Sequence, residues 1–137
     1  MKIYGYASLF NIEDLSGDVV RPGAFSKSLK NLEESFEVLP MLPNHNVENP
    51  MGIWNVVYED LKGLYVEGEL LETDIISKQW ANLIQSYVIN GLSIGFRTVK
   101  SRKVDHGRIL TELELWEVSI VLHPMLVQAK LNFNLDS

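Results

Sequence analysis

The chain has 137 residues, a length that favours one domain with a single core. Hydrophobic residues make up 46% and charged residues 22%, which excludes a mainly disordered chain. There is no cysteine, so disulfides, thiol nucleophiles and thiolate metal sites are excluded. The net charge of −6 argues against a nucleic-acid partner, because a phosphate-binding surface usually needs an excess of positive charge. The longest apolar runs fall well short of the ~20 residues that span a bilayer. We therefore expect a protein of a reducing, cytoplasmic-type compartment with no cofactor, membrane or nucleic acid.

The first third of the chain alternates between strand, loop and helix patterns. Residues 2–10 are rich in Tyr, Ile and Leu and predict a strand, and the polar residues 11–22 predict a long loop. Apolar residues at helical spacing predict a helix over 23–35. A short strand over 37–42 and a loop over 44–50 follow.

The middle of the chain predicts a hairpin and a second helix. Residues 51–59 and 64–71 read as two strands, joined by a turn that contains a glycine. Thr73 or Asp74 can cap the next helix through a side-chain oxygen. Gly91 is well placed as a left-handed residue that ends this helix.

The last third predicts a long hairpin. Residues 92–104 and 108–122 read as strands around a tight turn, and the tail beyond 124 reads as one turn of helix and a final strand. About six strands, two helices and no alternation of strand with helix favour an α+β fold. This order is typical of a closed antiparallel barrel or a sandwich with attached helices. We predict a single domain over 1–137, built as a closed antiparallel β-barrel with about two flanking helices.

One short segment contains a candidate nucleophile. Residues 91–95 match the G-x-S-x-G elbow of α/β-hydrolases, but that elbow needs a strand before the serine and a helix after it, and here the order is reversed. On a strand, Ser93 and Gly95 share one face, where a glycine would let a substrate backbone approach. A helix-ending glycine and an ordinary packing glycine are the simpler explanation from the sequence alone.

A carboxylate on the strand over 108–122 is the second candidate. If that strand is regular, Glu117 and Ser119 share its otherwise apolar face, whereas Glu112 and Glu114 face solvent. An inward carboxylate is costly unless it accepts hydrogen bonds or pairs with a cation, and a histidine is a suitable partner. The alternative is a β-bulge near Trp116 that turns the Glu117 carboxylate out to solvent.

Three histidines could serve as the base that a serine nucleophile needs. His106 lies at the tip of the predicted hairpin, where a solvated role is the simplest. His123 follows Glu117 by six residues on one strand, roughly 20 Å at ~3.3 Å per residue, too far for a hydrogen bond without a sharp bend. His45 lies in a polar loop of a different element, 48 residues before Ser93, and is the preferred candidate.

Several short segments also match a known family in their order and spacing. They are GYA at 5–7, Phe10, GDVV at 17–20, PGAF at 22–25, His45, Gly52, GL at 63–64, GLSIGF at 91–96, and EVSIV at 117–121 followed by Pro124. In these segments the chain resembles the tailed-phage (caudovirus) prohead serine proteases. It departs from them at Asn46, where an acidic residue is frequent, and at Met125, where a small residue is usual.

The resemblance implies a fold similar to herpesvirus assemblins, a β-barrel with surrounding helices. It implies a serine endopeptidase that cuts scaffold segments or extensions of the major capsid protein inside the immature shell in the host cytoplasm, and often cuts itself. By position in the family, Ser93 is the nucleophile, His45 the base and Glu117 the third member. The analogy with assemblins, which gain activity on dimerisation, suggests a homodimer.

Two rival interpretations stay open at this point. One is a catalytically inactive β-barrel protein that assists capsid assembly or scaffolding. The other is a metal-binding barrel, which three histidines support poorly.

Overall fold

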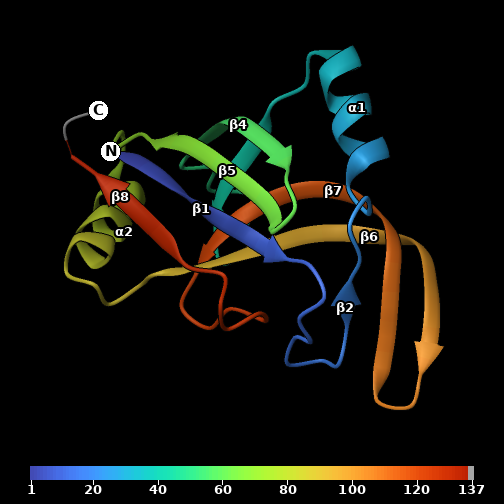
Figure 1. Cartoon of the computed structure of the whole chain (residues 1–137). Helices are drawn as coiled ribbons and strands as arrows, with labels where there is room; N and C mark the ends of the chain where they lie inside the picture. The colour runs from blue at the N-terminus through green and yellow to red at the C-terminus, as the bar shows by residue number, and fades with distance from the viewer. Residues whose placement is uncertain (136–137) are drawn as a thin grey trace.

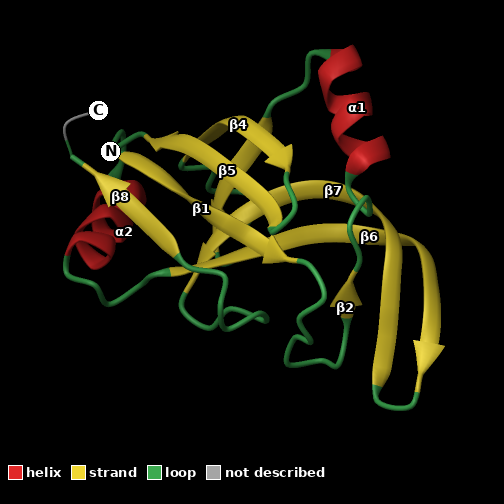
Figure 2. Cartoon of the chain, viewed as in Figure 1, coloured by secondary structure: helices red, strands yellow, loops and turns green. Residues whose placement is uncertain are grey.

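A computed structural model describes residues 1–135, so the last two residues of the predicted 1–137 domain lie outside the described part. Strands dominate the described chain, and two helices accompany them (Figures 1 and 2). The elements in chain order are β1 Lys2–Leu9, β2 Val19–Val20, α1 Ser26–Ser35, β3 Leu39–Pro43, β4 Gly52–Glu59, β5 Gly63–Leu70, α2 Ile75–Gln85, β6 Gly91–Val104, β7 Gly107–Val121 and β8 Leu131–Asn134.

The second helix starts where the sequence predicts and ends earlier. Asp74 is its N-cap, and its side chain and that of Ser77 form a reciprocal capping box. The helix ends at Gln85, and Tyr87, with φ of 60°, adopts the left-handed conformation expected of Gly91. The assignment of Gly91 as the helix end is therefore wrong, because this glycine is the first residue of β6. Among residues 1–135, neither helix is long and apolar enough to cross a membrane.

The strands form one mixed, open sheet, so the predicted closed antiparallel β-barrel is wrong. The strand order is β2-β7-β3-β4-β5-β1-β8, with β6 paired to the other edge of β7. Both β2 and β3 run parallel to β7, whereas the other pairs are antiparallel. An isolated bridge between Gly91 and Lys130 brings the start of β6 near β8, but no ladder of strands closes the sheet over residues 1–135.

The parallel pairs explain why a purely antiparallel arrangement fails. A parallel neighbour needs a crossover rather than a tight turn, and α1 is the helical part of the segment that carries the chain from β2 to β3 along one edge of β7. Figure 1 shows α1 beside β7 and β4, and α2 near β8 and the N-terminus.

The long hairpin of β6 and β7 extends beyond the rest of the sheet at its turn (Figure 1). Its opposite end, the last third of β7, is buried on both faces, because residues 117–121 are all buried. Trp54 of β4 donates its indole N–H to the carbonyl of Val118 at 3.0 Å, which ties β4 to this buried end. The fully buried side chains of the core include Ile3, Phe25, Met41, Leu64, Leu70, Leu92 and Ile120.

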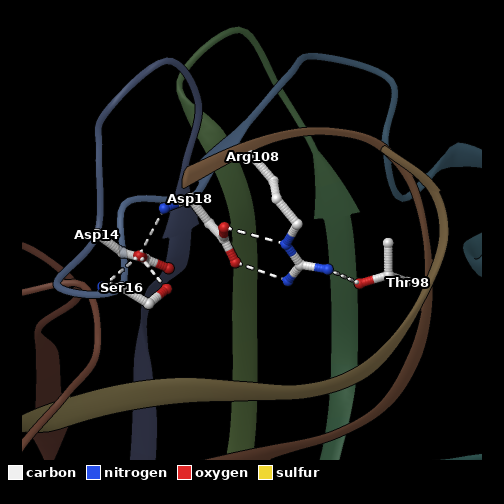
Figure 3. A network of polar contacts seen from close by, with 5 residues as sticks. All are labelled: Asp14, Ser16, Asp18, Thr98 and Arg108. Atoms are coloured by element: carbon white, nitrogen blue, oxygen red, sulfur yellow. Dashed lines mark hydrogen bonds and ion pairs between the residues drawn. The ribbon is translucent and has the colours of Figure 1, made fainter. Parts of the chain in front are cut away.

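A polar network fixes the loop between β1 and β2 to the long hairpin (Figure 3). Arg108 of β7 donates to both carboxylate oxygens of Asp18, at 3.2 and 2.8 Å, and to Thr98 of β6 at 3.3 Å. One oxygen of Asp14 accepts from the amide and hydroxyl of Ser16 and from the amide of Asp18. These bonds tie the loop to the hairpin, and the loop lines the same pocket as Ser93.

Candidate active site

The middle strand of three, β7, brings the candidate residues together. On one side it pairs with β6, where Ser93 lies opposite Ser119 and Gly95 lies opposite Glu117. On the other side it pairs with β3, which places Leu42 opposite Ser119. Residues that lie far apart in the sequence therefore become neighbours across two strand pairings.

His45 reaches this position through a tight reversal just after β3. Asn44 and His45 both have positive φ, 45° and 62°, a conformation that Asn and His tolerate better than most residues. The amide of Asn44 donates to the carbonyl of Ile120 at 3.0 Å, and its side-chain oxygen accepts from the amide of Leu122 at 3.3 Å. The amide of His45 donates to the hydroxyl oxygen of Ser119 at 2.9 Å. These bonds direct the imidazole back over β7.

The structure places Ser93, His45 and Glu117 in one chain of contacts. Nδ1 of His45 is hydrogen-bonded to Oε1 of Glu117. Nε2 of the same ring lies 3.2 Å from Oγ of Ser93. With the Nδ1 proton donated to the carboxylate, the lone pair of Nε2 faces the serine hydroxyl, which is the tautomer that a general base needs.

Glu117 is 7% exposed, and both of its carboxylate oxygens have partners. Oε1 contacts His45, and Oε2 accepts from the hydroxyl of Ser119 at 2.5 Å. The β6–β7 ladder does shift here, leaving Trp116 unpaired as in the bulge alternative. The bulge exposes Trp116 but leaves Glu117 inside, because this end of β7 is covered on both faces.

The space that Gly95 leaves open is occupied by Glu117. A Cβ atom at position 95 would lie 2.0 Å from Oε1 of Glu117 and 2.6 Å from its Cδ. From the sequence, a glycine here could let a substrate backbone approach, whereas in the structure the carboxylate of the facing strand fills this space. Gly95 thus matters because only a glycine lets Glu117 lie flat against β6.

Electrostatics at His45 favour proton uptake. The hydrogen bond to Glu117 raises the pKa of His45 above its usual value, and the negative charge of Glu117 acts in the same direction. Partial burial of the ring opposes this rise. A base beside a buried carboxylate can hold the proton of a serine hydroxyl as a stabilised imidazolium.

The two other histidines lie apart from this cluster. His106 is exposed in the turn between β6 and β7, and His123 is exposed beyond the end of β7. Within residues 1–135, no group of three or more His, Asp or Glu residues is arranged to hold a metal ion.

Two hollows flank the imidazole. A pocket of about 230 Å³ lies on the Ser93 side, and its walls are mainly apolar, with Asp14 and Asp18 of the β1–β2 loop in the lining. A second, more open hollow on the far side is lined by Gly95, Trp116 and Glu117 together with apolar side chains such as Leu42 and Val47. A peptide laid across Ser93 thus finds apolar recesses on both sides of the histidine.

Sequence reasoning did not assign a role to Ser119, which contacts both His45 and Glu117. The signal was present, because strand alternation put Ser119 on the same inward face as Glu117. A polar side chain on an apolar face needs a partner as much as a carboxylate does.

Comparison with known proteins identifies the family. The family model described as caudovirus prohead serine protease matches residues 1–137. The chain belongs to this family. It is 36% identical over 129 residues to the prohead protease of Enterobacteria phage HK97, covering 91% of this chain and 56% of that relative. The chain therefore spans little more than half the length of the phage HK97 protein.

Solved structures show the same fold at low identity. The bacteriophage T4 capsid assembly protease aligns with a TM-score of 0.73 at 16% identity, covering 90% of this chain and 82% of that one. KSHV protease, solved with a hexapeptide phosphonate inhibitor, aligns with a TM-score of 0.57 at 11% identity, covering 97% and 65%. Varicella-zoster virus protease aligns with 0.56 at 12% identity, covering 98% and 64%. The assemblin-like expectation was correct in its choice of relatives, although the sheet of this chain is not a closed barrel.

Proposed function

We propose that this chain forms a single protease domain that cleaves scaffold segments and capsid-protein extensions during prohead maturation. The proposal places it inside the immature shell in the host cytoplasm, with the major capsid protein as its substrate and itself as a further one. Family membership supports the class of enzyme, and the phage HK97 relative supports the setting. The single observation that carries the chemistry is the contact chain from Glu117 through His45 to Ser93.

In this proposal each residue has one role. Oγ of Ser93 attacks the scissile carbonyl carbon while its proton passes to Nε2 of His45. When the C–N bond breaks, Nε2 returns that proton to the leaving amine and an acyl-serine remains. A water then loses a proton to Nε2 and attacks the acyl carbon, and the proton goes back to the departing Ser93. Throughout, Glu117 accepts from Nδ1 and stabilises the imidazolium.

Ser93→Ala and His45→Ala test the assignment. Each should reduce cleavage of the cognate capsid-protein precursor by about 10⁴-fold or more, because triad members act as a unit. His106→Ala and His123→Ala are the matched controls and should cleave at the wild-type rate, since both side chains are exposed outside the site. Circular dichroism would check that all four variants are folded.

A fluorophosphonate probe separates this proposal from the inactive-scaffold alternative. An active triad labels Ser93 in the wild type and fails to label it in His45→Ala. Retention of more than about a tenth of the activity in Ser93→Ala would refute the nucleophile assignment. Absence of labelling and cleavage in the wild type would favour the non-enzymatic alternative. The homodimer suggested by the assemblin analogy belongs to the same proposal, and sedimentation of the purified chain tests it.

A further inference from the structure

The mechanism above leaves one buried hydroxyl at the site without a role. Ser119 has 0% exposure and lies in the middle strand of the site, opposite Ser93 on β6 and Leu42 on β3. Within residues 1–135, its hydroxyl is hydrogen-bonded to His45 and Glu117 and not to Oγ of Ser93. Buried polar groups are almost always hydrogen-bonded, so the role of this serine should follow from the partners of its hydroxyl.

The Ser119 hydroxyl joins the two ends of the His45–Glu117 pair. Its oxygen accepts from the amide of His45 at 2.9 Å, and its proton is donated to Oε2 of Glu117 at 2.5 Å. A hydroxyl that accepts one hydrogen bond becomes a better donor for the next, so the two bonds strengthen each other.

Each of these bonds fixes a different degree of freedom. The bond to the His45 amide holds the main chain of a residue in the left-handed region, from which the imidazole direction follows. The bond to Oε2 fixes the last torsion of the Glu117 side chain, so that Oε1 points at Nδ1. One hydroxyl thus sets the donor and the acceptor of the same hydrogen bond.

We propose that Ser119 is a positioning residue: its hydroxyl orients Glu117 and the His45 main chain so that Nδ1 keeps its carboxylate partner and Nε2 faces Ser93. Its consequence for turnover rests on the proposed protease function. Its consequence for the titration of His45 does not, because that titration is a property of the folded chain alone.

Removal of the hydroxyl should lower turnover more than substrate binding. We expect Ser119→Ala to reduce kcat by about 10- to 100-fold, the usual effect of losing a hydrogen bond to a charged group at a reacting pair, with KM nearly unchanged. The raised pKa of His45 depends on its bond to Glu117, so it should fall when the carboxylate is free to turn away. The acid limb of the pH profile of kcat/KM should then move to lower pH.

The other charged groups near His45 are the same in every variant. Asp14 and Asp18 of the β1–β2 loop line the pocket that His45 also lines, and Asp18 is paired with Arg108 of β7. No substitution at position 119 changes these groups, so a shift in the His45 titration reports on Glu117.

Two further variants make the test specific. Ser119→Thr keeps both the donor and the acceptor, and it should restore kcat and the acid limb even if the added methyl group lowers stability. Ser28→Ala is the matched control, since Ser28 is also a buried serine, 7% exposed, whose oxygen accepts a β7 amide, that of Leu115, at 2.8 Å. It should lower stability without moving the acid limb.

Titration of His45 by ¹⁵N NMR gives a readout that needs no cleavage. We expect a lower midpoint in Ser119→Ala than in the wild type, and a wild-type midpoint in Ser119→Thr and Ser28→Ala. If Ser119→Ala does not fold, Ser119→Cys, whose S–H is a weak donor, replaces it with the same expected direction. An unchanged midpoint in the folded alanine or cysteine variant, or a folded threonine variant that keeps the lowered midpoint, overturns the proposal. If the wild type cleaves nothing, the proposed function fails and the NMR result still decides the role of Ser119.

Discussion

Substitution of Gly95 by alanine should disable the site although Ser93, His45 and Glu117 all keep their identities. The backbone of Gly95 lies outside the left-handed region, so alanine causes no backbone strain there. The new Cβ would lie 2.0 Å from Oε1 of Glu117, whereas an unstrained contact needs ~3.5 Å. The carboxylate must therefore withdraw by about 1.5 Å, away from Nδ1 of His45.

This displacement sets the expected size of the effect. A misplacement of about 1 Å at a reacting group can cost about 100-fold in rate, so Gly95→Ala should lower kcat by at least that factor. Overpacking at this position should also lower the free energy of unfolding, by about 1–3 kcal/mol. Steady-state cleavage of a peptide taken from the cognate capsid protein measures the first effect, and urea denaturation measures the second.

A double variant shows whether the effect passes through Glu117. In Glu117→Ala the carboxylate is gone and the space beside position 95 is open, so adding Gly95→Ala should change kcat by less than about threefold. If the two losses instead multiply, or if Gly95→Ala alone turns over at the wild-type rate, the close packing of Gly95 against Glu117 does not control the site.

Two further predictions concern charge. The hydrogen bond to Glu117 raises the pKa of His45, and in the proposed mechanism the ring must be neutral to accept the serine proton. The acid limb of kcat/KM in the wild type should therefore lie at higher pH than an unperturbed histidine would give, and it should move to lower pH in Glu117→Gln. An unmoved limb would show that another group titrates. Arg108→Met leaves the buried Asp18 carboxylate unpaired and should lower the free energy of unfolding by about 1–2 kcal/mol in urea denaturation, allowing for solvent around the half-exposed guanidinium. Arg97→Met breaks a pair between two exposed side chains and should lower the free energy of unfolding less than Arg108→Met does; equal losses would contradict the structural role given to Asp18.

The local parts of the fold could be predicted from the sequence because they depend on neighbouring residues. The β4–β5 and β6–β7 hairpins and the cap of α2 at Asp74 follow from turn glycines, alternation and a capping side chain. The pairing of β3 with β7 joins segments more than 70 residues apart, and no local pattern records that it is parallel. The two-residue strand β2 is too short to show alternation at all.

The sequence could likewise predict those features of the candidate site that depend on a single strand. Alternation along β7 pointed to Glu117 as inward, although the strand is irregular at Trp116 and burial on both faces is what keeps the carboxylate inside. The same argument placed Glu114 in solvent, where it pairs with Arg97, and Glu112 too, although its side chain is only 19% exposed. The packing of Gly95 against the carboxylate depends on register across two strands, which one strand's pattern cannot show.

The wide spacing of the site along the chain has a consequence for folding. His45 lies 48 residues from Ser93 and 72 from Glu117, and the three meet only when β7 has paired with both β3 and β6. Contacts of such long range form late, because chain closure costs entropy before they are gained. In a chain that is still being synthesised, or in one whose β3 is not paired with β7, Ser93 is not in contact with His45. In the proposed protease, recovery of serine reactivity during refolding is therefore expected to mark the step at which the last of these pairings is made.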